Sequence, residues 1–154
     1  MKDIKVCLIA SSGGHIEELM QLNKIREKYS HFFMFPETAW TRQIDGKKYF
    51  ILDMNRKNKC TKLFSLFKMF FQQIFIYFKE RPNLIVTTGA VVALPICLYA
   101  KVFHKKIIFI ESIARVTSCS QTGKIMVKLA DLFIVQWEDQ LKCYPEAKYG
   151  GWIF

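Results

Sequence analysis

The chain has 154 residues, which is enough for one domain with a single core and too short for two full domains. Hydrophobic residues make up 51% of it and aromatic residues 15%, a composition that excludes an intrinsically disordered chain. The formal net charge of +10 predicts an anionic partner, and nucleic acid, anionic lipid and phosphorylated substrates all fit it. We expect residues 1–154 to form one domain.

The cysteines and the apolar runs bear on the compartment. The five cysteines are odd in number and form no CxxC pair, a pattern that favours a reducing cytosol. The apolar run from Val6 to Ala10 is too short for a secretory signal. The uncharged stretch from Leu84 to Ala100 falls short of the ~20 residues of a spanning helix, and Thr87-Thr88-Gly89 and Pro95 interrupt it. We expect a strand, a turn and a core helix there.

Strands and helices alternate along the whole chain. Ile4 to Ala10 is a short run of β-forming residues that ends at Ser11-Ser12-Gly13-Gly14, after which apolar residues recur at helical spacing up to Ile25. Further strands are predicted at 31–35, 49–52, 84–87, 106–110 and 132–135, and helices at 63–78, about 91–103 and about 123–130. Continuous apolar strands in such an alternation predict a Rossmann-like, doubly wound α/β fold with a parallel sheet covered on both faces.

Three polar loops follow predicted strands, at the sheet edge where open α/β sheets bind ligands. The first is Ser11-Ser12-Gly13-Gly14-His15, whose glycines allow close approach of a ligand and whose helix start favours an anion. The second is Thr87-Thr88-Gly89-Ala90. The third runs from Glu111 to Ser118 and carries hydroxyls, a carboxylate and the Arg115 guanidinium, which can bind phosphate in a bidentate manner. Together the loops favour a phosphate-bearing ligand over a purely structural explanation.

Two side chains in these loops are candidates for catalysis. His15 can hydrogen-bond a sugar hydroxyl or act as a general base near neutral pH, and the alternative is a capping or supporting histidine. Glu111 can bind or activate an acceptor hydroxyl, or simply pair with Arg115. The candidates for substrate binding are the remaining small, polar and cationic loop residues Ser11, Ser12, Gly13, Gly14, Thr88, Gly89, Ser112 and Arg115.

Several other classes of site lack their motifs. The first loop does not have the full GxGxxG spacing of a dinucleotide site, so we expect no such cofactor. No HExxH, Cys/His cluster or DxD pair supports a metal site. The chain also has no GxSxG nucleophile elbow and no RNP-type motif or zinc finger, which argues against a hydrolase and against a nucleic-acid partner.

A basic aromatic segment runs from Arg56 to Arg81. It contains seven Lys or Arg residues and a single acid, Glu80. On a helical wheel the apolar side chains of Leu63 to Phe78 fill roughly 180°, more than the ~100° that an ordinary surface helix needs. A basic helix with a phenylalanine-rich side is typical of an interfacial membrane anchor. We therefore predict a membrane face made of Lys57, Lys59, Lys62, Phe64, Phe67, Lys68 and Phe71. Two alternatives stay open: every Phe packs on the sheet beneath a solvated row of lysines, or the arc is divided between core and lipid.

The motifs taken in order resemble those of a known family. They are Ser11 to His15, Thr87 to Gly89, Glu111 to Val116, Thr122 to Lys124, Ala130-Asp131 with Phe133 to Trp137, and Tyr144-Pro145 to Gly150-Gly151. They resemble the membrane-recruiting subunit of the eukaryotic dolichol-linked GlcNAc transferase. They are closer still to its bacterial relatives in capsule and exopolysaccharide synthesis, the polysaccharide biosynthesis proteins or galactosyltransferase enhancers. The resemblance extends from about Lys5 to Gly151.

The resemblance implies a GT-B glycosyltransferase divided between two chains. This chain would correspond to the N-terminal half, which contacts the membrane and the polyprenyl-diphosphate acceptor, while a partner chain binds most of the UDP-sugar. It gives Gly13, Gly14 and His15 a role at the acceptor, and Glu111 and Arg115 a place facing the cleft between the chains. We thus expect a glycosyltransferase subunit active only with its partner, peripheral on the cytoplasmic face of the cell membrane. A non-catalytic recruiter and enhancer of the partner is the alternative.

One departure from the eukaryotic subunit concerns the anchor. That subunit has an N-terminal transmembrane anchor, whereas the first predicted strand of this chain begins at Ile4. The segment from Arg56 to Arg81 is the expected substitute. The apolar ending Trp152-Ile153-Phe154 is expected to dock either on the partner or on the domain itself.

Overall fold

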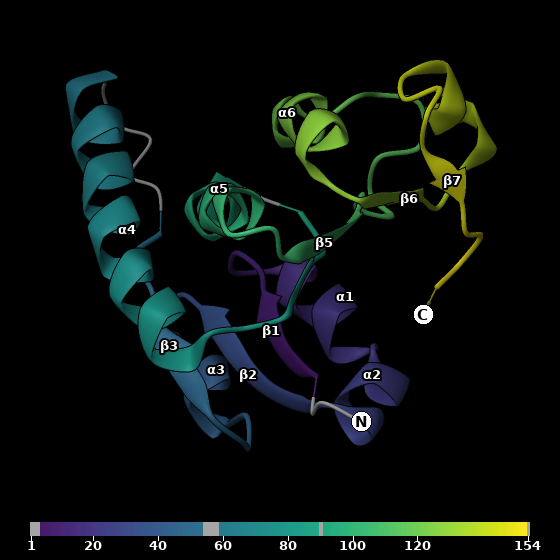
Figure 1. Ribbon diagram of the computed structural model, residues 1–154. Helices are drawn as coiled ribbons and strands as arrows, with labels where there is room; N and C mark the ends of the chain where they lie inside the picture. The colour runs from purple at the N-terminus through teal and green to yellow at the C-terminus, as the bar shows by residue number, and fades with distance from the viewer. Residues whose placement is uncertain (1–3, 54–58, 90, 154) are drawn as a thin grey trace.

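A computed structural model describes residues 4–53, 59–89 and 91–153. They form a sheet of seven parallel strands in the order β3-β2-β1-β4-β5-β6-β7 (Figure 1). In chain order the strands are β1 Lys5–Ile9, β2 Ser30–Phe35, β3 Lys48–Phe50, β4 Leu84–Thr87, β5 Lys106–Ile110, β6 Leu132–Val135 and β7 Lys148–Tyr149. The helical segments are α1 Gly14–Met20, α2 Asn23–Lys28, α3 Ala39–Gln43, α4 Lys59–Glu80, η1 Val91–Ala93, α5 Leu94–Val102, α6 Gln121–Leu129 and η2 Glu138–Lys142.

Alternate residues of the central strands enter two separate cores, because successive side chains of a strand point to opposite faces. Cys7 and Ile9 of β1 pack in one cluster with residues of α4, α5 and α6. Val6 and Leu8 pack in the other, which includes Ile16 and other residues of α1. Helices on both faces explain why β1 is almost wholly buried and reads as a continuous apolar run.

The predicted fold class is confirmed, and three of the strands match their predicted bounds. The first helix is divided in two, because Leu22 has a non-helical backbone (φ −74°, ψ 50°) between α1 and α2. Helix α3 was not predicted; Thr38 starts it with a reciprocal capping box to Thr41. The short strand β7 at the sheet edge was not predicted either.

The cysteines differ in their states. Cys119 and Cys143 form a disulfide that joins the loop before α6 to the end of η2. Cys7 and Cys97 are free thiols buried in the core. Nothing in the spacing of the cysteines predicted the Cys119–Cys143 pair.

Helix α4 is fixed to the sheet at its C-terminal end by Glu80. This buried carboxylate accepts a hydrogen bond from Tyr49 and forms ion pairs with Lys5 (2.6 Å) and Lys47 (2.7 Å). Burial alone would raise the pKa of Glu80, but the hydrogen bonds from Lys47, Lys5 and Tyr49 outweigh it and hold the pKa at about 2. The cluster lies beside the start of β1, at the edge of the sheet opposite to the three loops.

Candidate functional site

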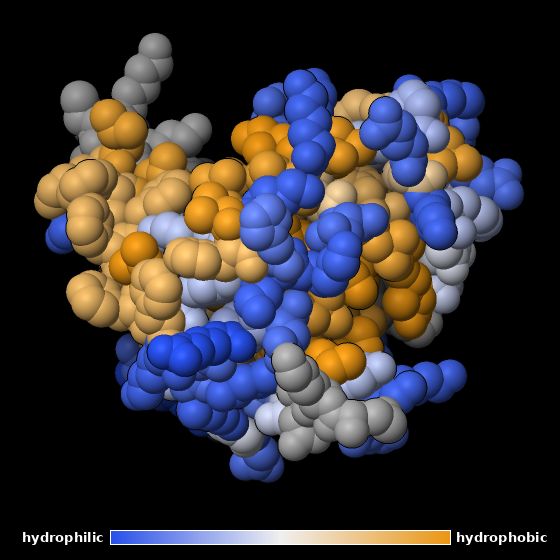
Figure 2. Space-filling model, in the orientation of Figure 1, coloured by the Kyte–Doolittle hydropathy of each residue, from blue (hydrophilic) through white to orange (hydrophobic). Residues whose placement is uncertain are grey.

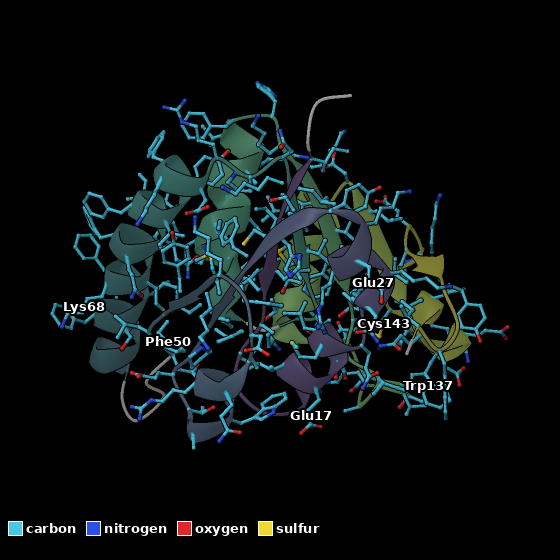
Figure 3. The ribbon with its side chains drawn as sticks, turned by 90° about the horizontal axis from the view of Figure 1, so that it is seen from below. Glu17, Glu27, Phe50, Lys68, Trp137 and Cys143 are labelled. Atoms are coloured by element: carbon cyan, nitrogen blue, oxygen red, sulfur yellow. A yellow bond between two sulfur atoms is a disulfide. The ribbon has the colours of Figure 1, made fainter. Side chains whose placement is uncertain are left out.

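The order of the strands reverses between β1 and β4, which are neighbours at the centre of the sheet. In open α/β sheets such a switch point leaves a crevice at the carboxyl ends of the strands, where ligands bind. The first and second loops follow β1 and β4 at this place, and the third follows β5 beside them. Phe50 ends β3, Glu17 lies in the helix after β1, and Trp137 follows β6. In Figure 3 all three labels lie in the lower half of the view.

His15 connects the first loop to the second. Its Nδ1 lies 2.8 Å from the carbonyl oxygen of Thr88, and the Thr88 hydroxyl donates to the carbonyl of His15. Because a carbonyl only accepts, Nδ1 carries the proton in the neutral ring and Nε2 keeps its lone pair. Within the described chain Nε2 has no hydrogen-bond partner. The ring is half-buried, so Nε2 is the atom of His15 that can accept a proton.

Glycines shape both of these loops. Gly89 has φ 109°, a conformation that other residues rarely adopt, and a Cβ there would stand 3.1 Å from the His15 ring. Gly13 has φ 83°, and Cβ atoms added at Gly13 or Gly14 would meet nothing within 4 Å. The backbone of the first loop therefore faces open space. Of the two serines, Ser12 is exposed and donates to Asp53 (3.0 Å), and Ser11 is half-buried.

Glu18 connects the first helix to the third loop and was not predicted as a site residue. Its Oε1 accepts hydrogen bonds from Ser112 Oγ (2.7 Å) and from the Ile113 amide (3.1 Å). Burial raises the pKa of Glu18, while the Ser112 hydrogen bond and the positive charge of a protonated His15 act in the opposite direction. Its position three residues after His15 was the available signal, because residues at this spacing share one face of a helix.

Glu111 is buried, with only 1% of its surface exposed. Its Oε2 accepts from Ser120 (2.8 Å) and Tyr144 (2.9 Å), and its Oε1 accepts from the Ser112 amide (3.2 Å). Burial and the nearby carboxylate raise the pKa of Tyr144 to about 12, so the phenol stays a donor. A Cβ at Gly123 would collide with this cluster. The expected alternative, an ion pair of Glu111 with Arg115, is not formed.

The predicted substrate-binding residues divide into exposed and supporting positions. Arg115 is exposed, and its guanidinium donates to Ser118 Oγ (3.2 Å). Thr88 and Ser112 are buried, and their hydroxyls are used by His15 and Glu18. The predicted side chains that a ligand can reach are therefore those of Ser12, Arg115 and the half-buried His15, together with the open backbone of the first loop. Among the described residues no group of three His, Cys, Asp or Glu is placed to hold a metal ion.

Helix α4 exposes five of its six phenylalanines, and only Phe70 is half-buried. Its buried side is made of Met69, Gln73, Ile76, Tyr77 and Glu80, and the aromatic arc predicted for the apolar side is largely exposed. The exposed apolar side chains of α4 are Leu63, Phe64, Phe67, Phe71, Phe75 and Phe78, here called the phenylalanine face. The alternative in which every Phe packs on the sheet is therefore wrong. Figure 2 shows this apolar surface over α4, with hydrophilic side chains beside it.

Two glutamines explain this orientation of α4. Gln73 is fully buried; its Nε2 donates to the Val92 carbonyl (2.8 Å) and its Oε1 accepts from the Ile96 amide (3.0 Å), which caps the start of α5. Gln72 binds Leu52 and Phe50 at the end of β3 in the same way. These backbone groups need polar partners, so the glutamines turn inward and the phenylalanines outward.

Cations share the exposed side with the phenylalanines. The Lys68 ammonium lies 4.6 Å from the centre of the Phe64 ring, and Figure 3 shows Lys68 projecting away from the sheet. Lys68 therefore lies beside the phenylalanine face. Lys57 lies outside the described residues; Lys59 and Lys62 belong to α4. Along the part of the chain that the structure describes, no helix has both the length and the apolarity of a membrane span.

Of the apolar ending, Trp152 is exposed and packs edge-on against Trp137, at 5.9 Å between ring centroids. Ile153 packs against the core beside α1, and Phe154 lies outside the described residues. The Trp137 indole also donates to the Ile113 carbonyl (2.8 Å), which ties the segment after β6 to the third loop.

A family model described as "Oligosaccharide biosynthesis protein Alg14 like" matches residues 6–153. The chain is 27% identical to the mouse (Mus musculus) UDP-N-acetylglucosamine transferase subunit ALG14, over 99% of this chain and 84% of the relative. It is 42% identical to the Kluyveromyces lactis subunit ALG14 over 47% of this chain, and that match spans about a third of the relative (34%).

Solved structures share the fold at low sequence identity. The Acinetobacter baumannii MurG structure superposes with a TM-score of 0.70 at 15% identity and covers 88% of this chain. UDP-N-acetylglucosamine 2-epimerase from Rickettsia bellii superposes with a TM-score of 0.69 at 16% identity and covers 90%. The chain spans 42% and 40% of these two proteins. It therefore has the fold of one Rossmann-like half of a GT-B protein.

Proposed function

The chain belongs to the family of Alg14-like oligosaccharide biosynthesis proteins, and from this premise we propose that it is the acceptor-binding and membrane-associating subunit of a two-chain GT-B glycosyltransferase. The partner chain carries the half that binds the UDP-sugar. The acceptor is a lipid-linked polyprenyl diphosphate, and the complex adds one sugar to it. The family membership and the likeness to one half of larger GT-B proteins support a complex of two chains.

The single observation that carries the acceptor role is the junction of loops at the switch point. His15 of the first loop is bonded to Thr88 of the second, Glu18 of the first helix is bonded to the third, and Arg115 extends from that third loop. The open backbone at Gly13 and Gly14 suits one end of a diphosphate, and a guanidinium suits its oxygens. A phosphate-bearing acceptor fits this arrangement better than a neutral one.

We assign His15 the part of general base. The acceptor hydroxyl attacks the anomeric carbon of the donor sugar, UDP leaves with the bonding electrons, and His15 Nε2 takes the hydroxyl proton. The bond from Nδ1 to Thr88 holds the tautomer that this step needs. Glu111 is assigned a positioning role, because its carboxylate is enclosed by Ser120, Tyr144 and the Ser112 amide.

The phenylalanine face is the proposed membrane contact. It is apolar and exposed, the Lys68 ammonium stands beside it, and Lys57, Lys59 and Lys62 precede it in the chain. Cations next to inserted aromatic side chains suit a leaflet with anionic headgroups. Gln73 bonds the middle of α4 to the segment just after the second loop, so the membrane contact and the acceptor site belong to one packed unit.

We place the complex on the cytoplasmic face of the cell membrane, in the synthesis of a capsular or exopolysaccharide. This setting rests on the resemblance of the motifs from Ser11 to Gly151, since the curated relatives described above are eukaryotic.

A detergent-soluble polyprenyl-diphosphate acceptor tests the proposal without a membrane. Transfer of sugar is measured for the partner chain alone, for the partner with this chain, and for the partner with the His15→Ala variant. We expect transfer only in the presence of the wild-type chain, with a loss of at least 100-fold in His15→Ala. Equal rates with and without this chain would favour the alternative, a recruiter and enhancer whose partner performs all the chemistry.

A further inference from the structure

Glu18 is a buried acid that joins two distant parts of the chain. Its side chain is 8% exposed. The single oxygen Oε1 accepts from Ser112 Oγ at 2.7 Å and from the Ile113 amide at 3.1 Å. One carboxylate oxygen thus connects α1, which carries His15, to the loop that carries Arg115.

The second oxygen of Glu18 is unusual. Oε2 is buried and has no hydrogen-bond partner in the described chain. The titratable groups that act on the carboxylate are His15 on α1 and Glu111, which follows β5. A buried carboxylate with one unsatisfied oxygen lowers the stability of a fold, so it calls for an explanation other than stability.

Apart from the two bonds to Glu18, the hydrogen bonds of the third loop do not reach α1 in the described chain. Ser112 Oγ, besides donating to Glu18, accepts from the Ala114 amide (3.3 Å), and the Arg115 amide donates to the Ser112 carbonyl (3.0 Å). From the other side the Trp137 indole donates to the Ile113 carbonyl (2.8 Å). The place of the Arg115 backbone relative to α1 therefore depends on the two bonds that Glu18 accepts.

We propose that Glu18 is a positioning residue of the acceptor site, which fixes the loop carrying Arg115 relative to the helix carrying His15. Its task is to keep the guanidinium at the right distance from the first loop, so that both contact the same diphosphate. This inference rests on the proposed acceptor role and adds a residue to it that touches no substrate.

The test compares three variants of the full chain. Glu18→Leu fills the space but cannot accept a hydrogen bond, and Glu18→Gln keeps an oxygen that can accept both bonds. Glu17→Leu is the matched control, because Glu17 is the neighbouring acid of the same helix and is exposed (Figure 3). Two quantities are measured by NMR: the exchange rate of the Ile113 amide, and the Kd for farnesyl diphosphate as a short polyprenyl diphosphate. Amides of β1 report whether the fold is intact.

We expect Glu18→Leu to speed exchange of the Ile113 amide at least tenfold and to weaken farnesyl diphosphate binding at least fivefold, with β1 unchanged. Glu18→Gln should restore both values to within about twofold of the wild type, and Glu17→Leu should match the wild type. The positioning role would be overturned if Glu18→Leu sped exchange of the Ile113 amide but left the Kd unchanged. It would also be overturned if Glu18→Leu left the exchange of the Ile113 amide unchanged.

If Glu18→Leu does not fold, Ser112→Ala removes one of the two donors from the other side and should weaken binding about threefold; an unchanged Kd there would overturn the inference. If farnesyl diphosphate does not bind the wild-type chain at all, the proposed acceptor role fails. If it binds the wild type and Glu18→Leu with the same Kd, only the positioning role of Glu18 fails.

Discussion

Replacing two exposed phenylalanines should detach the chain from lipid without disturbing its fold. Phe67 is 59% exposed and Phe71 54% exposed, and their rings lie 4.7 Å apart on the phenylalanine face. Taking ~200 Å² for each side chain, the pair exposes roughly 220 Å². At ~25 cal/mol per Å², full burial in lipid corresponds to about 5 kcal/mol, and half burial to about 2.5 kcal/mol. Half burial is the reasonable depth for a helix lying in the interface.

The assay is cosedimentation with vesicles of phosphatidylcholine and phosphatidylglycerol. The double variant Phe67→Ser with Phe71→Ser should lower the partition coefficient by about 30- to 100-fold, which is the factor that ~2.5 kcal/mol implies. Ile125→Ser is the control, because Ile125 is also an exposed apolar side chain (48%) but lies on α6, away from α4. Binding of the double variant equal to that of the wild type, with unchanged circular dichroism, would refute a lipid contact at this face.

Three further predictions concern the loops and the stability of the fold. Gly89→Ala introduces a Cβ next to His15 at a positive φ, so it should lower the free energy of unfolding by about 1–3 kcal/mol and reduce sugar transfer; chemical denaturation and the transfer assay measure the two effects. Glu80 has a pKa lowered from 4.5 to about 2, so its stabilisation is complete above pH 4.5 and is lost as the pH falls toward 2. Urea unfolding should give the wild type a free energy of unfolding that is lower at pH 3 than at pH 7 by on the order of 2–3 kcal/mol. Glu80→Gln should lack this difference. Cys143→Ser removes the Cys119–Cys143 disulfide and should lower the free energy of unfolding by about 2–4 kcal/mol. Its Tm should be lower than that of the wild type and equal to that of the wild type measured with reductant.

The fold could be predicted because its central strands are buried on both faces. Runs such as Leu84 to Thr87 are short, continuous and apolar, and each is followed by a polar loop and a helical pattern. That pattern leaves few alternatives to a parallel sheet. The edge elements α3 and β7 lack it, because they are only five and two residues long.

The contents of the site could be predicted only in part. Glycine and histidine at the end of β1 are a local signal, and the structure places them at the switch point. The separation of Thr88, Ser112 and Glu111 into buried supporting positions depends on long-range partners such as Glu18 and Tyr144, which no local pattern reveals. For Glu18 the local signal is limited to its place three residues after His15 in the same helix.

The orientation of α4 could not be read from its periodicity. A wheel assumes that apolar side chains face the core, but here Gln73 and Glu80 are buried because each has specific partners on the sheet side. The buried glutamine caps α5, and the buried glutamate binds two lysines. The exposed phenylalanines are a consequence of these polar contacts.

The most direct test of the central claim, that this chain holds the acceptor, is a pair of KM values for the two-chain complex in detergent. They are measured for the wild type and for Arg115→Ala, once with varied polyprenyl-diphosphate acceptor and once with varied UDP-sugar. Loss of a guanidinium–phosphate contact should raise the acceptor KM about tenfold or more and leave the donor KM within about twofold. A raised donor KM with an unchanged acceptor KM would contradict the account.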